Sequence, residues 1–489
     1  MSSIWDYVTE NYWTVLIILN YVLAISAAIT VIFKNIDPTK TLTFLFVLVF
    51  FPFFGLVIYY LFGQEYRKTK IFNRKEILNA SVIKSAAGQM KLSKSEFKNV
   101  NDKVNEKIKL VKLLKSSDQS PLTIRNEAEI IINGLEKFER LLEDIKNAEI
   151  FLHIEYYIIK TDRTGKRFLD ALCEKAQEGL EVRLIYDDVG SSISREYKQK
   201  LNQSGVEHHP FMPVLFSGYT GKMNYRNHRK IAIIDGKIGY VGGVNVADDY
   251  VNYEGTDEDF YWRDTHLRIC GEAVKVLQFH FLTSWDFVLG EKIEIKESFF
   301  PEVNCDKDVA IQIAASGPDT DWANIMEAIL TAINNAEEYV YLTTPYFIPN
   351  DQVVSALQIA AKIGLDVRLL IPKRSDSWIA KHASNSYLEP ILAAGVRVFR
   401  YEKGFIHAKT MVVDDSFCTI GTCNIDNRSF NINFEINALI YDIEQSKKMK
   451  EIYLNDLKDS EEVDFERWKE RSKFCKFKES YSRLWAPLL

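Results

Sequence analysis

The feature that most constrains the fold of this 489-residue chain is a pattern that occurs twice. Each copy has a histidine, a lysine two residues later, an aspartate, and then a glycine and an asparagine at equal offsets. These residues are His228, Lys230, Asp235, Gly242 and Asn245 in the first copy, and His407, Lys409, Asp414, Gly421 and Asn424 in the second. The apolar residues before each aspartate predict a strand, in which a histidine and a lysine two residues apart project from the same face.

The duplication extends to the segments that precede the two patterns. Residues 147–158 resemble residues 335–348, and residues 179–186 resemble residues 364–371. Helices alternate with apolar strands in both halves, an order typical of α/β layers around a mainly parallel, buried sheet. We expect two halves related by a pseudo-twofold axis, with both patterned strands at one shared cleft.

The N-terminal residues predict a transmembrane helical hairpin. Residues 12–33 and 41–63 are uncharged, mostly apolar runs, and each is long enough to cross a bilayer as a helix. A cleaved signal peptide is disfavoured because no lysine or arginine precedes the first run and no small-residue cleavage site separates the two. Two buried soluble helices are the other alternative. The basic residues that follow place both ends of the hairpin, and the catalytic part, in the cytoplasm.

The pattern divides the chain into a hairpin (1–66), a basic helical linker at the membrane surface (67–118), a first half (119–290), a connection (291–308) and a second half (309–489). Residues 67–115 contain fourteen Lys and Arg against four Asp and Glu, whereas the whole chain carries a net charge of −6. Such a basic stretch favours contact with anionic headgroups. A solvated helical linker is the alternative.

Composition also limits the kind of site. The negative net charge argues against nucleic acid as a partner. The six cysteines are scattered singly, without the spacing of a metal site or a disulfide framework, so we expect a reduced catalytic part. No glycine-rich phosphate-binding loop is present. The sequence therefore predicts neither a metal nor a cofactor.

The paired histidines and lysines predict phosphoryl-transfer chemistry. A neutral imidazole can attack phosphorus, and a protonated imidazole can donate to a leaving alkoxide. Lys230 and Lys409 can hold the non-bridging oxygens, and Asn245 and Asn424 can donate to the same oxygens. We expect a two-step displacement through a covalent phosphohistidine, with an alcohol or water as the second acceptor.

On these motifs the chain resembles the phospholipase D superfamily. Together with its N-terminal hairpin, it is similar to the bacterial cardiolipin synthases in particular, with local matches at residues 155–158, 187–188, 242–248, 262–264, 345–349 and 424–430. Thr422, where Ser is common, is a mild departure. The resemblance implies reversible phosphatidyl transfer between two phosphatidylglycerol molecules, giving cardiolipin and glycerol. It also implies an integral protein of the bacterial plasma membrane that acts on phosphatidylglycerol and other anionic lipids.

The resemblance further implies roles for single residues. Glu435 and Asp264 match carboxylates that orient the histidines, but the sequence does not decide which carboxylate faces which histidine. It also leaves open which histidine attacks, although family precedent favours His228. The pattern includes Asp235 and Asp414 with the catalytic residues, and a structural role at the strand ends is an equal alternative.

Other interpretations stay open. Arg428 could meet an anionic headgroup or form a plain surface salt bridge. A hydrolytic phospholipase D, or a phosphatidyltransferase with another acceptor alcohol, would use the same residues. A nuclease is disfavoured by the hairpin and the acidic halves. A non-catalytic scaffold is disfavoured because both patterns are intact. The sequence does not decide the oligomeric state.

Overall fold

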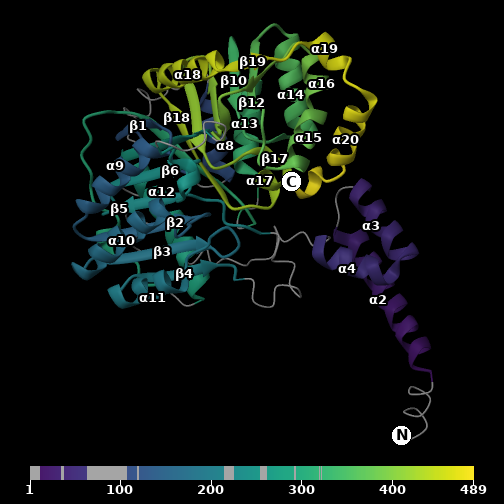
Figure 1. The fold of residues 1–489 in the computed structure, drawn as a ribbon, viewed down its shortest axis with the longest axis horizontal. Coiled ribbons are helices and arrows are strands. Elements are labelled where there is room, and N and C mark those ends of the chain that lie inside the picture. Colours follow the sequence, from purple (N-terminus) through teal and green to yellow (C-terminus); the bar gives the residue numbers. More distant parts are fainter. Residues whose placement is uncertain are drawn as a thin grey trace, which may run out of the picture. The chain divides into compact units, whose positions relative to one another are not determined.

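The computed structural model describes residues 11–34, 38–62, 107–117, 120–213, 225–253, 261–290, 293–318, 320 and 322–489. They belong to two units, which Figure 1 shows. One unit holds the N-terminal helices. The other holds both halves of the duplication, so the candidate site can be described within a single unit.

The N-terminal unit contains α2 (Tyr12–Lys34), α3 (Pro38–Phe50) and α4 (Pro52–Phe62). Among the described residues, only α2 is long and apolar enough to cross a membrane. The second apolar run is divided at Phe51, because Pro52 has no backbone N–H and its ring clashes with the preceding turn. Gly55 allows the bend, since a Cβ there would lie 2.7 Å from the Val47 carbonyl oxygen. At about 20 Å, α3 is shorter than the hydrocarbon core of a bilayer. A second crossing therefore stays a prediction.

The first half is built on a seven-stranded sheet with the order β1-β8-β6-β5-β2-β3-β4. Its strands are β1 (Asn126–Ile132), β2 (Phe151–Tyr156), β3 (Glu181–Asp187), β4 (Glu207–Phe211), β5 (Ile231–Ile234), β6 (Ile238–Gly242) and β8 (Thr265–Gly271). Its helices are α9 (Gly134–Lys146), α10 (Arg163–Gln177), α11 (Arg195–Ser204) and α12 (Ala273–Leu289). Apolar residues of α9, α10 and α11 bury one face of this sheet in a common core.

The second half repeats this arrangement on an eight-stranded sheet with the order β19-β13-β12-β10-β15-β16-β18-β9. Its strands are β9 (Ala310–Ser316), β10 (Tyr339–Thr343), β12 (Asp366–Pro372), β13 (Arg397–Tyr401), β15 (Thr410–Val413), β16 (Phe417–Gly421), β18 (Glu435–Tyr441) and β19 (Ser460–Glu462). Its main helices are α13 (Asn324–Asn334), α14 (Asp351–Lys362), α15 (Trp378–Ser386), α16 (Leu388–Leu392) and α18 (Ile443–Lys458). The duplicated α/β architecture is confirmed.

The strand directions differ from the expectation of mainly parallel sheets. In the first sheet only β2–β3 and β3–β4 are parallel pairs, and in the second only β10–β12 and β12–β13 are. The remaining pairs in these described sheets are antiparallel. Tight turns account for two of these pairs, because β5 and β15 each return directly into β6 and β16, and such turns can join only antiparallel strands. The other antiparallel pairs join strands that are separated by longer connections. Both sheets are therefore mixed.

Helix α8 (Ile108–Ser117) is the described end of the predicted membrane-surface linker, and it packs on the second half. Leu110, Val111 and Leu114 are buried in the core of that half. The Lys107 ammonium, just before the helix, donates to Asp414 Oδ2 at 2.8 Å. Residues 67–106 lie outside the described residues, so their contact with the membrane surface stays a prediction.

Candidate active site

Both patterned segments are hydrogen-bonded to the opposite half of the molecule. His228 N donates to Phe434 O at 3.0 Å, and His407 N donates to Arg263 O at 2.7 Å. The second contact continues a parallel pair between β7 (Tyr261–Arg263) and β14 (Gly404–Ile406). The histidines and lysines themselves precede β5 and β15 rather than lying within them. The pseudo-twofold relation thus holds for the backbone that carries the two imidazoles.

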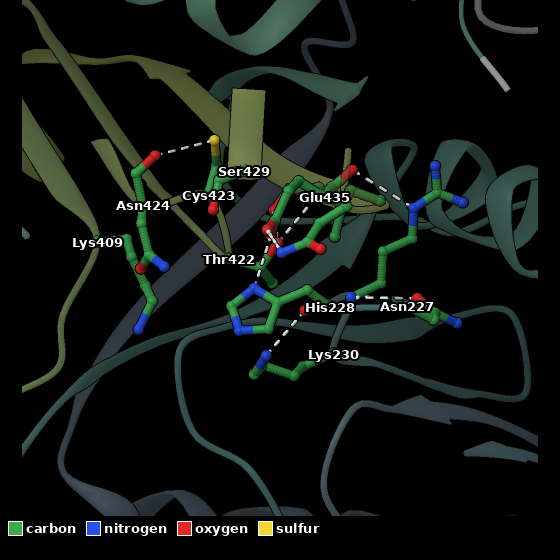
Figure 2. A network of polar contacts seen from close by, with 12 residues as sticks. Asn227, His228, Lys230, Lys409, Thr422, Cys423, Asn424, Ser429 and Glu435 are labelled. Carbon is green, nitrogen blue, oxygen red and sulfur yellow. Dashed lines mark hydrogen bonds and ion pairs between the residues drawn. The ribbon is translucent and has the colours of Figure 1, made fainter. Parts of the chain in front are cut away.

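Each imidazole is paired with a carboxylate from the other half. His228 Nδ1 lies 2.9 Å from Glu435 Oε2 (Figure 2), and His407 Nδ1 lies 2.7 Å from Asp264 Oδ2. In both cases the carboxylate residue directly follows the residue whose carbonyl accepts from the histidine N–H. The same backbone contact and the same side-chain contact thus occur in both halves. Glu435 faces His228, and Asp264 faces His407.

The two carboxylates are supported differently. Thr422 Oγ1 donates to Glu435 Oε2 at 2.5 Å, and Asn433 Nδ2 donates to Oε1 at 3.4 Å. At the equivalent position of the first half, Gly243 has no side chain, and a Cβ there would lie 2.1 Å from Asp264 Oδ1. The shorter aspartate therefore fits where the chain has a glycine, and the longer glutamate fits where a hydroxyl can hold it.

Burial keeps both imidazoles neutral. Their exposed fractions are 9% for His228 and 6% for His407. Burial lowers the pKa of His228 to about 4, and burial together with the Lys409 charge lowers the pKa of His407 to about 3. Burial alone would raise the pKa of Glu435, but His228 and Lys230 outweigh it and lower that pKa. A neutral imidazole beside a carboxylate donates from Nδ1, which leaves the lone pair on Nε2.

The two lysines are buried beside the imidazoles. Lys230 Nζ donates to the His228 carbonyl at 2.8 Å, and Lys409 Nζ donates in the same way to the His407 carbonyl. Lys409 Nζ also lies 2.8 Å from His407 Nδ1 and 2.9 Å from Nε2. Burial lowers the pKa of Lys230 to about 7 and that of Lys409 to about 8, against the opposing effect of the two carboxylates. Two buried cations at one site favour an anionic partner, such as the phosphodiester of a lipid.

The two asparagines of the pattern have different surroundings. Asn245 Oδ1 accepts from Ile158 N at 3.2 Å, and its Nδ2 donates to the Tyr250 hydroxyl at 2.7 Å. The buried Oδ1 of Asn424 has no hydrogen-bond partner among the described residues (Figure 2). An unpartnered amide oxygen can accept from a ligand hydroxyl, whereas a phosphoryl oxygen would need the Nδ2 donor.

The structure places Asp235 and Asp414 at the far ends of β5 and β15, away from the histidines. Asp235 accepts from three successive backbone N–H groups, those of Glu149, Ile150 and Phe151, at 2.7–2.9 Å. Asp414 accepts from the three equivalent groups of residues 337–339 at 2.9–3.0 Å. This placement supports the structural alternative and corrects their inclusion with the catalytic residues.

Arg428 lies on α17 (Asn427–Asn431), near the first imidazole. Its Nε donates to Asn433 Oδ1 at 3.2 Å. Burial raises the pKa of Tyr157, and the Arg428 charge opposes this rise. The ring of Tyr157 is 5.0 Å from that of His228. Sequence reasoning did not single out Tyr157, because nothing in the sequence distinguishes it from an aromatic residue of the core.

Aromatic residues also surround the second imidazole. The ring centroids of Trp262 and Tyr250 lie 5.3 Å and 5.6 Å from that of His407. By contrast, His153 packs between Phe281 and Phe299 in the first half, which is a structural environment. Among the described residues, no cluster of three or more His, Cys, Asp or Glu side chains could hold a metal ion. Metal independence itself stays a prediction.

The matching protein families follow the same division of the chain. A family described as "Cardiolipin synthase, PLD-like domain" matches residues 141–277 and 329–457, one segment in each half. A second, described as "Phospholipase D-nuclease N-terminal", matches residues 22–64. The first match therefore covers more than half of the chain and includes both patterned segments.

Similar proteins are found over nearly the whole length. The cardiolipin synthase of Alkalihalophilus pseudofirmus is 41% identical over 464 residues, which cover 94% of this chain and 91% of that protein. The cardiolipin synthase of a Geobacillus species is 38% identical over 492 residues, with coverages of 99% and 96%. The crystal structure of phosphatidylserine synthase from Haemophilus influenzae superposes with a TM-score of 0.61 at 14% identity. It covers 78% of this chain and 100% of that one. At that identity the likeness concerns the fold alone.

Proposed function

Because this chain belongs to the cardiolipin synthase family of the phospholipase D superfamily, we propose that it converts two phosphatidylglycerol molecules into cardiolipin and glycerol. The observation that carries the proposal is the reciprocal pairing of His228 with Glu435 and of His407 with Asp264. Two oriented imidazoles can divide attack and proton transfer between them. The reaction exchanges one phosphodiester for another, so it needs no activated nucleotide.

In the first step, an imidazole Nε2 attacks the phosphorus of one phosphatidylglycerol. A P–N bond forms, the bond to the glycerol headgroup oxygen breaks, and the second imidazole protonates the departing glycerol. Lys230 and Lys409 neutralise the non-bridging oxygens during this transfer. Burial disfavours the protonated form of the second imidazole. The negative charge of a bound phosphodiester favours that form and so raises the pKa of this imidazole.

In the second step, a terminal hydroxyl of another phosphatidylglycerol attacks the phosphohistidine. The second imidazole takes the hydroxyl proton, the new P–O bond forms and the P–N bond breaks. This returns both imidazoles to their starting protonation states. Water can attack the phosphohistidine by the same steps as a lipid hydroxyl. Which acceptor reacts therefore depends on how well the lipid hydroxyl is positioned.

The contacts of the two imidazoles favour His228 as the nucleophile. Its Nε2 has no hydrogen-bond partner among the described residues and faces the side on which Lys409 lies (Figure 2). The Lys409 ammonium lies 2.8 Å from His407 Nδ1 and 2.9 Å from Nε2, so its charge acts on the whole ring. Burial and this charge lower the pKa of His407 to about 3, and a less basic imidazole is a weaker nucleophile and a stronger acid, so His407 is better placed as the acid and base.

The protein is membrane-associated, as its family and the apolar helix α2 indicate. We further propose that it is an integral protein of the bacterial plasma membrane with two crossings and a cytoplasmic catalytic unit. In that position phosphatidylglycerol is concentrated at the site, and a well-oriented lipid hydroxyl can have an effective molarity of roughly 10⁵ M or more, enough to outcompete bulk water.

The test uses purified full-length protein in phosphatidylglycerol vesicles. Glycerol and cardiolipin should appear in equal amounts, with little phosphatidic acid. Brief reaction of the parent protein with radiolabelled lipid should trap a phosphatidyl group on His228, and the His228→Ala variant should trap none. Phosphatidic acid as the main product would mean that water is the acceptor, and the activity would then be that of a hydrolytic phospholipase D.

A further inference from the structure

The C-terminal helix α20 (Lys473–Arg483) presents an apolar face to solvent. Its large apolar residues recur at intervals of three or four, a spacing that places them on one side of a helix. The face continues through two residues with helical backbone angles beyond the helix end. Its members are Phe474, Phe477, Tyr481, Leu484 and Trp485, with exposed fractions between 43% and 75%. We call these five residues the aromatic face.

The opposite side of α20 is firmly attached to the second half, so the exposure of the aromatic face is not a result of loose packing. Glu479 is buried and pairs with Arg471 at 2.8 Å, and Arg471 also pairs with Glu389 of α16 at 3.1 Å. The Ser482 side chain is buried as well. These contacts fix the helix with its aromatic face directed outward.

The apolar surface continues onto α15, which packs against α20. Trp378 and Ile379 at the start of α15 are exposed by 54% and 37%. The centre of the Trp378 ring lies 4.6 Å from that of the His382 ring. Burial lowers the pKa of His382, and the charge of Lys478 on α20 lowers it further. His382 therefore lies near α20, and so does the Trp378 ring packed against it.

Basic residues accompany the aromatic face. Lys473 and Arg483 are exposed at the two ends of α20, and the Lys478 ammonium lies 4.5 Å from the centre of the Phe474 ring. The acidic residue of this helix, Glu479, is buried and already neutralised by Arg471. The outward surface of α20 is therefore apolar and positively charged, which is complementary to an anionic lipid surface.

The segments that flank the aromatic face lead to elements of the site. After α20 the chain is hydrogen-bonded to α17, which carries Arg428, since Arg428 N donates to Leu489 O at 3.0 Å and Asn427 Nδ2 donates to Pro487 O at 3.2 Å. Asp376, two residues before Trp378, accepts from the Tyr346 hydroxyl at 2.7 Å, and its charge raises the pKa of Lys409 against the effect of burial. The aromatic face is thus connected through the fold to the segments that carry the site residues.

We infer that the aromatic face is an interfacial docking surface that holds the catalytic unit against the headgroups of an anionic bilayer. A membrane-spanning helix keeps the chain at the membrane but does not orient the catalytic unit, whereas aromatic rings inserted at headgroup level do. The phosphodiester of a phospholipid lies at that same level. The inference deepens the proposed function and rests on it for the identity of the lipid.

The first experiment compares two substrates of the full-length protein. The variant Phe474→Ser/Phe477→Ser/Trp485→Ser should lose roughly tenfold or more of its rate on phosphatidylglycerol vesicles and keep its rate on monomeric short-chain phosphatidylglycerol. The matched control is Ile359→Ser/Ile363→Ser, which removes two exposed apolar residues, one within α14 and one directly after it. Equal losses on both substrates would show a structural role, and unchanged rates on both would show no role. Either result overturns the inference.

The second experiment does not depend on catalysis. A fluorescent label at Phe477→Cys, in a chain whose six native cysteines are replaced, should be quenched by brominated acyl chains in vesicles of phosphatidylglycerol and phosphatidylcholine. Quenching should be weaker in phosphatidylcholine alone. Absence of quenching, or protection of the label by a second copy or by the N-terminal helices, would overturn the inference even if the chain makes cardiolipin.

Discussion

At the scale of single residues, each catalytic imidazole depends on a carboxylate that lies far away in the sequence. Glu435 holds His228 through Nδ1, and Thr422 in turn donates to the same carboxylate oxygen. The carboxylate fixes the tautomer that leaves Nε2 free to attack, and it stabilises the positive charge that develops on the ring.

We therefore expect Glu435→Gln to lower kcat by about 10²- to 10⁴-fold, because the amide loses the charge and can present the wrong group to Nδ1. Rapid-quench measurement of phosphohistidine would check that formation of the intermediate is slowed. Thr422→Ser, which keeps the hydroxyl, is the control and should stay near the parent rate. An unchanged burst in Glu435→Gln would contradict the assignment.

The buried lysines predict how activity depends on pH. Burial lowers the pKa of Lys230 to about 7 and that of Lys409 to about 8, so their positive charges are present below these values and are lost as pH rises through them. Since kcat/KM reports on the free enzyme, it should fall as pH rises through this range. A bound phosphodiester favours the ammonium forms, so kcat should persist to higher pH. A kcat/KM that stays constant to pH 10, measured on short-chain lipid, would contradict this.

At the scale of elements, Asp235 stabilises the turn that leads into β2. Its carboxylate accepts from three backbone N–H groups, and its own φ of +52° lies in the left-handed region, which aspartate and asparagine tolerate better than alanine. Asp414 has the equivalent place before β10, with a φ of +50°. The duplicated aspartate is thus part of the fold of each half.

Asp235→Ala should destabilise the protein by about 2–4 kcal/mol, because backbone donors lose their acceptor and the turn gains strain. Thermal unfolding in detergent would measure this, and the folded fraction should keep a kcat near that of the parent. Asp235→Asn, which suits the same backbone angle and keeps one oxygen, should be milder. A large loss of kcat with unchanged stability would restore a catalytic role for this residue.

At the scale of the whole molecule, the chain joins the proposed catalytic unit to an apolar helix long enough to cross a membrane. We expect residues from 67 onward to face the cytoplasm. In a chain without native cysteines, an impermeant reagent applied to intact cells should label Thr39→Cys, at the start of α3 on the predicted external side, and not Ser116→Cys on α8. Ser116 is exposed, so burial would not prevent its labelling. The reverse pattern would overturn the proposed topology.

The sequence alone was sufficient for the duplicated α/β architecture and for the two histidine and lysine pairs, because repeated offsets along the chain report on repeated local structure. It predicted mainly parallel sheets where most strand pairs are antiparallel, since apolar runs do not encode strand direction. It could not assign Glu435 to His228 or Asp264 to His407, because these contacts join residues 207 and 143 positions apart. Only the packing of one half against the other decides such pairs, and the same packing separates the structural aspartates from the catalytic histidines.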